Sequence, residues 1–300
     1  HLADEFRTVK ALHSRGKPYD TSLKVAVLTA WGQLRAWACC GHFNHGNPYN
    51  EAMESLSGLP VETVLISFDD IIAEGIPEDI DVILNAGRLG DAWSGARHWE
   101  NPQVVSILTG WVARGGGLIG IADATAAAGK MDYFQLAEVF GVEKETGLTP
   151  MFTKAQPALI AGHYITAMLS GRAPTLGQTV SGVYPLGSAA AILAVEGKDV
   201  VMAANAFHQG RSVYLAGYVH SNENTRLLEQ AIRWAARREN ESVEWTSTNC
   251  HVECAFFPDA GQLAVINNST VPQTAVIPGG GRDYSVQLEP YGLQLIDIPQ

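Results

Sequence analysis

Short apolar runs alternate with longer amphipathic segments across residues 22–240. Each run has the length and the Val, Ile, Leu and Ala content of a buried strand. The runs are Val25–Leu28, Val64–Ile66, Val82–Leu84, Leu118–Ile121, Ala191–Val195, Val200–Ala203 and Val213–Leu215. Because strands and helices alternate, the pattern predicts an α/β fold with right-handed βαβ units on a mainly parallel, doubly wound sheet.

Three amphipathic segments carry the signals of helix ends. Asn47 and Asn101 each precede a proline, which is the arrangement of an N-cap followed by the first helical residue. After Asn101, apolar residues recur on one helical face. They are Val104, Leu108, Trp111 and Val112. The third predicted helix begins at Ser221 or Asn222 and ends near Arg238. For residues 151–185 we expect only short strands or loops.

The pattern changes after residue 240, where apolar positions alternate. Val252, Cys254 and Phe256 share one face of a predicted strand, and turns rich in Pro, Asn and Gly follow. This pattern predicts a small antiparallel β domain. The expected organisation is a tail and linker at residues 1–21, an α/β domain at 22–240 and a β domain at 241–300.

Composition narrows the classes of function. The chain has 300 residues and a formal net charge of −11, which disfavours binding to nucleic acid and to anionic membranes. No apolar run is long enough for a membrane helix, and the first twenty residues have no apolar core of a signal peptide. Of the four cysteines, Cys39 and Cys40 are adjacent, so we expect a reduced, cytoplasmic protein.

Polar and aromatic side chains follow the predicted parallel strands at the point where each strand ends. In such a sheet these ends share one edge, where ligands bind. The residues are Trp31, Arg35, Trp37, Cys39, Cys40, His42, Asp69, Asp70, Asn85, Arg88, Asp91, Trp93, Ser94, Asp123, Thr125 and His220. The sequence therefore predicts a binding site at this edge, with a protein interface as the alternative, because interfaces have the same residue profile.

The segment GGGLIGIADATA resembles the strand-to-helix turn of class I amidotransferases and related hydrolases, where the turn presents a Cys or Ser nucleophile. Here the turn holds Ala122, Asp123 and Ala124. Asp123 is then either a helix-capping residue or a carboxylate nucleophile. No metal site is expected, because the compact group of Cys39, Cys40, His42 and His45 lacks the second half of a zinc site.

Several segments together resemble the bacterial lacto-N-biose/galacto-N-biose phosphorylase family, which includes the galactosyl-rhamnose phosphorylases. They are VAVLTAWGQLRAWACCGH, LISFDD, LNAGRLGDAWSG, GWVARGGGLIGI, DYFQLAEVFGV, GRSVYLAGY and NTRLLEQAIRWAA, in this order. The resemblance implies a TIM-barrel-like domain first, then an amidotransferase-like α/β domain without its nucleophile, then a small β domain. This chain resembles the last two and is expected to be a fragment.

The resemblance also implies a reaction, the inverting phosphorolysis of a β-galactoside to α-galactose 1-phosphate and a free sugar. It implies no metal or organic cofactor, and a general acid on the barrel, so no catalytic residue is expected here and the chain alone is expected to be inactive. The substrate-binding residues it implies are Trp31, Arg35, Trp37, His42, Arg88, Trp93 and Ser94. The implied partners are phosphate, the disaccharide and the barrel domain, with a homodimer left open.

The acceptor sugar stays open between N-acetylhexosamine and rhamnose, because the resemblance implies that selectivity lies mostly in the part of the family that this chain does not resemble. The chain also departs from the family pattern, so its substrate contacts are not expected to match those of the relatives closely. Asp123-Ala124 stands where many relatives have Glu-Pro, and Gly95-Ala96 where they have Gly-Gly. Two other functions also stay open. One is a free-standing, non-catalytic sugar-binding or regulatory module that holds a sugar between Trp31, Trp37 and Trp93. The other is a hydrolase that uses Asp123.

Overall fold

The computed structural model describes residues 10, 11, 14, 16, 23–30, 47–127, 132–145, 162–169 and 174–299. Two compact units are present. We call them the α/β unit, which comprises Leu23–Leu59 and Thr63–Asn240, and the β unit, which includes Glu241–Gln300. Within the described residues, no helix is both long and apolar enough to cross a membrane.

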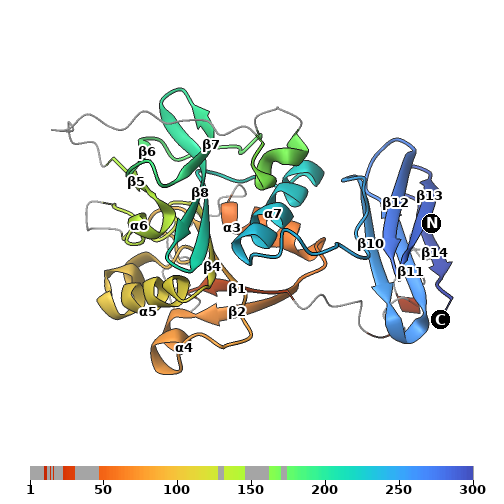
Figure 1. Ribbon diagram of the computed structural model, residues 1–300, viewed down its shortest axis with the longest axis horizontal. Helices are drawn as coiled ribbons and strands as arrows, with labels where there is room; N and C mark the ends of the chain where they lie inside the picture. The colour runs from red at the N-terminus through yellow and green to blue at the C-terminus, as the bar shows by residue number, and fades with distance from the viewer. Residues whose placement is uncertain are drawn as a thin grey trace, which may run out of the picture. The chain divides into compact units, whose positions relative to one another are not determined.

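The described part of the α/β unit is built on a seven-stranded sheet with the order β2-β1-β3-β4-β9-β8-β7 (Figure 1). The strands are β1 (Lys24–Thr29), β2 (Glu62–Ser67), β3 (Val82–Gly87), β4 (Gly117–Ala122), β7 (Ala191–Glu196), β8 (Asp199–Phe207) and β9 (Gly210–Leu215). The pairs β1/β3, β3/β4 and β4/β9 are parallel, whereas β7/β8 and β8/β9 are antiparallel. The predicted strands and the mainly parallel sheet are therefore confirmed.

Helices cover both faces of this sheet. They are α3 (Pro48–Ser57), α4 (Phe68–Ala73), α5 (Pro102–Ala113), α6 (Ala137–Phe140) and α7 (Asn222–Ala235). α3 contacts α7 and α4 contacts α5. Gly117 and Gly120 point to opposite faces of β4. A methyl group at Gly117 would meet the backbone of Ala235 in α7, and one at Gly120 would meet the ring of Phe140 in α6.

The predicted helix ends agree with the structure. The side chains of Asn47 and Asn101 accept hydrogen bonds from Tyr49 N–H and Gln103 N–H, as N-caps do. Ser221 caps α7, which ends at Ala235, three residues before the predicted end. In the poorly patterned stretch after residue 150, the described residues contain the 3₁₀ helix η3 (Tyr164–Leu169) and the strand β6 (Val183–Pro185), which pairs with β5 (Val142–Lys144).

The β unit contains antiparallel sheets, as predicted. One has the order β10-β11-β14 and the other pairs β12 with β13. The strands are β10 (Val252–Phe257), β11 (Gln262–Asn267), β12 (Gln273–Gly279), β13 (Arg282–Leu288) and β14 (Leu293–Asp297). Val252, Cys254 and Phe256 belong to one apolar core, where Trp245 stacks on Phe256 with ring centroids 4.0 Å apart. The alternation in the sequence thus marks the core face of β10.

Candidate functional site

The carboxyl ends of the parallel strands lie at one edge of the sheet of the α/β unit, which we call the carboxyl edge. β1, β3, β4 and β9 end there at Thr29, Gly87, Ala122 and Leu215. Of the predicted binding residues, Arg88, Trp93 and Ser94 follow β3 directly. The other predicted binding residues lie outside the described residues: Trp31, Arg35, Trp37 and His42.

Ser94 shapes the loop that follows β3, Arg88–Gly95. Its hydroxyl oxygen lies 2.8 Å from the carbonyl oxygen of Arg88 and 3.0 Å from that of Asp91, and its single proton is shared between these two acceptors. The Ser94 carbonyl in turn accepts from the Asn85 side-chain amide. Ser94 and Asn85 have no exposed surface. Both therefore hold the loop in its shape, and their side chains do not reach the surface of the edge.

Asp91 joins this loop to the first turn of α3. Its carboxylate accepts hydrogen bonds from the Asn47 side-chain amide and from Trp93 N–H. Next to these bonds the rings of Tyr49 and Trp93 stack with centroids 4.6 Å apart. Burial raises the pKa of the Asp91 carboxyl group, because desolvation penalises its charged form. Two segments far apart in the sequence are thus locked together, and Trp93 is held in one orientation.

Arg88 keeps hydrogen-bonding capacity for a ligand. One terminal nitrogen donates to the side-chain oxygen of Gln178 at 2.9 Å. Its Nε atom is buried, yet has no hydrogen-bond partner in the part of the chain that the structure describes. A guanidinium group has five N–H donors in a fork that suits phosphate, carboxylate and sugar oxygens. Arg88 is therefore the described residue of this edge best suited to bind an oxygen-rich ligand.

The turn after β4 presents no available nucleophile. Ala122 has a left-handed backbone with φ of 64°, and its side chain is a methyl group. The Asp123 carboxylate is occupied, because it pairs with Lys144 Nζ at 2.7 Å and accepts from Leu89 N–H at 3.0 Å. Thr125 is fully buried. Asp123 thus anchors the loop after β3 from below, and this geometry gives no support to the hydrolase alternative.

His220 connects the loop after β9 to α3. Its ring nitrogen Nδ1 lies 2.9 Å from the hydroxyl of Ser55, and its backbone N–H donates to the Glu51 carboxylate at 2.7 Å. α3 and its N-cap therefore contact both neighbours. Asn47 and Tyr49 contact the Arg88–Gly95 loop, and Glu51 and Ser55 contact His220. The prediction that His220 follows the last parallel strand at this edge is confirmed.

Asp69 and Asp70 follow β2, as predicted, but they stand in a helix. The predicted strand ends at Ser67, and both aspartates lie exposed in the first turn of α4. The Asp70 side chain accepts from Ser67 N–H, while Ser67 Oγ accepts from Asp70 N–H, which forms a capping box. Their charge stabilises the helix N-terminus. That they add to the edge site stays a prediction.

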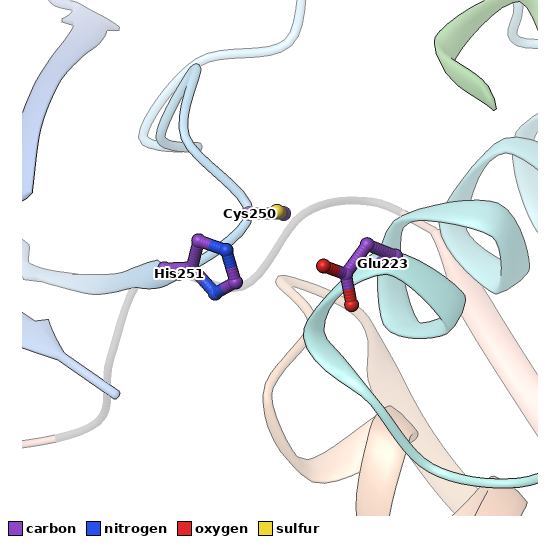
Figure 2. A group of neighbouring side chains, drawn as sticks. All are labelled: Glu223, Cys250 and His251. Atoms are coloured by element: carbon purple, nitrogen blue, oxygen red, sulfur yellow. The ribbon is translucent and has the colours of Figure 1, made fainter. Parts of the chain in front are cut away.

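Figure 2 shows three side chains of metal-ligating type. Glu223 lies in the first turn of α7, whereas Cys250 and His251 directly precede β10. Glu223 belongs to the α/β unit and the other two residues to the β unit. We assign no metal site to them. The predicted group of Cys39, Cys40, His42 and His45 lies outside the described residues.

Family models match almost the whole chain. The lacto-N-biose phosphorylase central domain matches residues 24–240, and the lacto-N-biose phosphorylase C-terminal domain matches residues 245–296. These ranges contain, respectively, the described sheet of the α/β unit and the strands of the β unit.

Relatives of known activity are similar over the same range. A 1,3-β-galactosyl-N-acetylhexosamine phosphorylase of Lachnoclostridium phytofermentans is 37% identical over 96% of this chain and 40% of its own length. The corresponding enzyme of Bifidobacterium longum is 33% identical, covering 92% and 42%. A D-galactosyl-β-1→4-L-rhamnose phosphorylase of L. phytofermentans is 32% identical, covering 99% and 40%. The chain spans about two fifths of the length of these relatives.

Solved structures share the fold at low identity. A catalytic mutant of a GH42 β-galactosidase from G. stearothermophilus has a TM-score of 0.53 at 14% identity, over 92% of this chain and 40% of that one. The β-galactosidase from Rahnella sp. R3 has a TM-score of 0.50 at 17% identity, over 91% and 40%. At such identities the likeness concerns the fold alone.

Proposed function

Because this chain belongs to the lacto-N-biose phosphorylase family, we propose that it acts as the central and C-terminal domains of a β-galactoside phosphorylase. The observation that carries the proposal is the similarity to three galactosyl-disaccharide phosphorylases over at least 92% of this chain. The acceptor sugar is N-acetylhexosamine or rhamnose, since relatives of both kinds match at 32–37% identity.

The proposed reaction is an inverting displacement at the galactosyl anomeric carbon. A phosphate oxygen forms a bond to that carbon while the glycosidic bond breaks, and the leaving sugar oxygen takes a proton from a carboxylic acid. The products are α-galactose 1-phosphate and the free sugar. The described carboxylates of the edge are engaged elsewhere: Asp91 with Asn47, Asp123 with Lys144 and Glu51 with His220. This supports a general acid on a TIM-barrel-like domain, as the family resemblance implies.

In this proposal the carboxyl edge is a wall of the sugar and phosphate site. Arg88 donates hydrogen bonds to ligand oxygens, and Trp93 offers its ring to a sugar face. Trp31, Arg35, Trp37 and His42 belong to the same wall, and Ser94 maintains the loop. The support is the free Nε donor of Arg88 and the fixed stack of Trp93 on Tyr49.

Finer features belong to the same proposal. The α/β unit is taken as a class I amidotransferase-like domain that has lost its nucleophile, because a methyl side chain, that of Ala122, occupies the left-handed position at the end of β4. The activity is classed as hexosyl transfer. A cytoplasmic location belongs to the same proposal, and its support is the adjacent pair Cys39-Cys40 in the sequence, which does not suit a disulfide framework. Sedimentation of the purified protein tests the homodimer.

A phosphorolysis assay tests the function. Galactosyl-β-1,3-N-acetylglucosamine and galactosyl-β-1,4-rhamnose are incubated with phosphate, and release of α-galactose 1-phosphate is measured. We expect none from the 300-residue chain and turnover from the product of the complete reading frame that contains it. Turnover by the chain alone would overturn the placement of the acid. No turnover by the complete product, with either disaccharide, would overturn the function.

Arg88 offers a sharper test in the active protein. Arg88→Ala removes hydrogen bonds from a charged donor, which are worth about 1.5–3 kcal/mol each, so we expect KM for phosphate or disaccharide to rise at least about tenfold. Arg97→Ala is the matched control, since that side chain is 79% exposed and pairs only with Glu100. Equal kinetics for the two variants would remove Arg88 from the site.

The second candidate is a non-catalytic sugar-binding module. The observation that favours it is an edge with an aromatic stack and a free arginine donor but no available nucleophile among the described residues. It predicts a saturable change of tryptophan fluorescence when galactose is added to the 300-residue chain. Absence of that change removes this candidate.

A further inference from the structure

A buried cluster of hydroxyl groups lies against the imidazole of His220. Ser55 has no exposed surface, Tyr218 is 3% exposed and Thr225 is 6% exposed. Ser55 Oγ lies 2.7 Å from Tyr218 Oη, 3.1 Å from Thr225 Oγ1 and 2.9 Å from His220 Nδ1. Each of the three hydroxyl groups has one proton to donate. Counting these protons shows which atom is the donor in the contact between Ser55 and His220.

Two of the three hydroxyl protons are used by carbonyl groups, which can only accept. Tyr218 Oη lies 2.9 Å from the carbonyl oxygen of Asn224, and Thr225 Oγ1 lies 2.9 Å from that of Ser221. Each hydroxyl has a single proton. With the proton of Tyr218 directed to the Asn224 carbonyl, the short contact between Tyr218 Oη and Ser55 Oγ uses the proton of Ser55.

This arrangement leaves one donor for the contact between Ser55 and His220. With the Ser55 proton directed to Tyr218, the bond is made only when Nδ1 carries a proton and donates it to Ser55 Oγ. Thr225 Oγ1 lies 3.5 Å from Nδ1 and does not donate to it, because its proton is directed to the Ser221 carbonyl. In the neutral imidazole the other nitrogen, Nε2, is then an acceptor.

Nε2 lies on the opposite side of the ring from Ser55, and His220 is half-buried. No hydrogen-bond partner of Nε2 occurs in the part of the chain that the structure describes. The residue is also held by its backbone N–H on Glu51. An acceptor with a fixed orientation is therefore present at an edge whose described carboxylates are already engaged.

His220 is connected to Arg88 through Gln178 and Gly217. Arg88 bonds to Gln178, and the backbone of Gln178 lies against Gly217, where an added methyl group would stand 2.6 Å from the Gln178 carbonyl oxygen. Gly217 and His220 are both in the segment between β9 and α7. The edge thus offers a donor at Arg88 and an acceptor at His220. A sugar hydroxyl both donates and accepts, so it suits such a pair.

We propose that His220 is a ligand-binding residue of the carboxyl edge, held in its Nδ1–H form by Ser55 so that Nε2 accepts a hydrogen bond from a sugar hydroxyl. The assignment of a sugar rests on the proposed function, whereas the protonation of Nδ1 does not. The two parts are therefore tested separately.

Nitrogen NMR of the ¹⁵N-histidine-labelled 300-residue chain at neutral pH tests the first part. The expected signal for His220 is that of a neutral ring protonated at Nδ1. Ser55→Ala removes the acceptor, so the ring should shift toward the Nε2–H form. Thr225→Val is the matched control, because it leaves the Ser55 to Tyr218 bond in place. A wild-type ring protonated at Nε2 overturns the proposal.

Phosphorolysis by the active protein tests the second part. His220→Asn keeps an amide donor near the position of Nδ1 and loses the atom at Nε2, whereas His220→Gln puts an amide near the position of Nε2. Loss of one neutral hydrogen bond predicts a KM for the disaccharide about three- to tenfold higher in His220→Asn, with kcat within about twofold. His220→Gln should be closer to wild type.

Each outcome decides one part. An unchanged KM in His220→Asn overturns the ligand contact, and so does an equal loss in both variants together with a lower melting temperature, which would mark a purely structural role. If the wild type shows no phosphorolysis, the proposed function fails, and the NMR result still decides how His220 is protonated.

Discussion

The two units use buried polar groups differently. In the α/β unit, buried polar side chains gather at and beneath the carboxyl edge, where Asn85, Ser94, Asp123 and Thr125 bond to the loops above them. In the β unit, the core around Trp245 is apolar, and the buried Asn267 braces a turn through its side-chain amide. Polar burial costs free energy unless it is fully bonded. At the edge, these bonds therefore hold the loops in their shape.

Trp245→Ala is expected to have the largest effect on stability and little effect on the edge. Trp245 is 5% exposed and stacks on Phe256 in the core of the β unit. Removing a buried aromatic ring costs about 3–5 kcal/mol. Urea denaturation measures the loss, and Tyr291→Ala, at a side chain 67% exposed, is the control and should change the free energy of unfolding by less than about 0.5 kcal/mol. A change in KM under folding conditions would contradict the separation of roles.

Asp123→Ala should weaken both stability and the edge. It leaves the ammonium group of Lys144, which is 16% exposed, without its partner, and it frees Leu89 N–H. Breaking a buried pair costs about 3 kcal/mol, somewhat less here because both side chains keep some exposure. Denaturation and KM are measured together, with Glu100→Ala as the control for an exposed pair. A loss of stability without any change in KM would show that the Arg88–Gly95 loop does not depend on this anchor.

Gly117→Ala probes the packing that holds α7 against the sheet. The new methyl carbon would lie 2.8 Å from the carbonyl oxygen of Ala235, which is backbone and cannot rotate away. Overpacking of this kind costs about 1–3 kcal/mol. Gly187→Ala is the matched control, because no atom lies within 4 Å of its added carbon. Equal melting temperatures for the two variants would mean that α7 shifts freely.

Asp91→Asn should have the smallest effect, and its effect should depend on pH. Burial raises the pKa of Asp91 in the folded state above the ordinary value of about 3.9. The folded state therefore favours the protonated carboxyl group. Its contribution to stability is present below pH 4 and is lost as the pH rises through the folded pKa. Asn does not ionise, so the stability of wild type relative to the variant should fall as the pH rises above about 4 and the folded carboxyl group ionises. If the free energies of unfolding of the two proteins changed in parallel with pH, burial of Asp91 would make no contribution to the pH dependence of stability.

Local rules in the sequence predicted much of the fold. Asn47 and Asn101 were identified as caps because capping involves only residues next to one another in the chain. The apolar runs marked β1, β3 and β4 because a strand buried on both faces needs apolar residues throughout. The helix that holds Asp69 and Asp70 was not predicted, because a strand that ends in a helix cap and one that ends in a binding loop look alike over a few residues.

The roles of polar residues at the edge were harder to predict. Ser94 and Asp123 look like ligand contacts or nucleophiles in the sequence, yet their side chains are used inside the protein. No sequence pattern near Asp123 predicts that Lys144 is its partner. Of the predicted site, Arg88 and Trp93 are half-buried, and the Nε of Arg88 has no hydrogen-bond partner in the described part of the chain. Their role in binding stays a prediction.

The sequence alone determined several features, because they depend on periodicity and on neighbouring residues. They are the order of strands and helices along the chain, the helix caps, the alternating faces of the β unit and the family resemblance. The tertiary structure decided which polar groups are engaged and which are free. The deciding pairs join Asp123 to Lys144, Asn47 to Asp91 and Ser55 to His220, at separations of 21, 44 and 165 residues. Such pairs form only after the sheet has brought its carboxyl ends together, and no local pattern of residues encodes them.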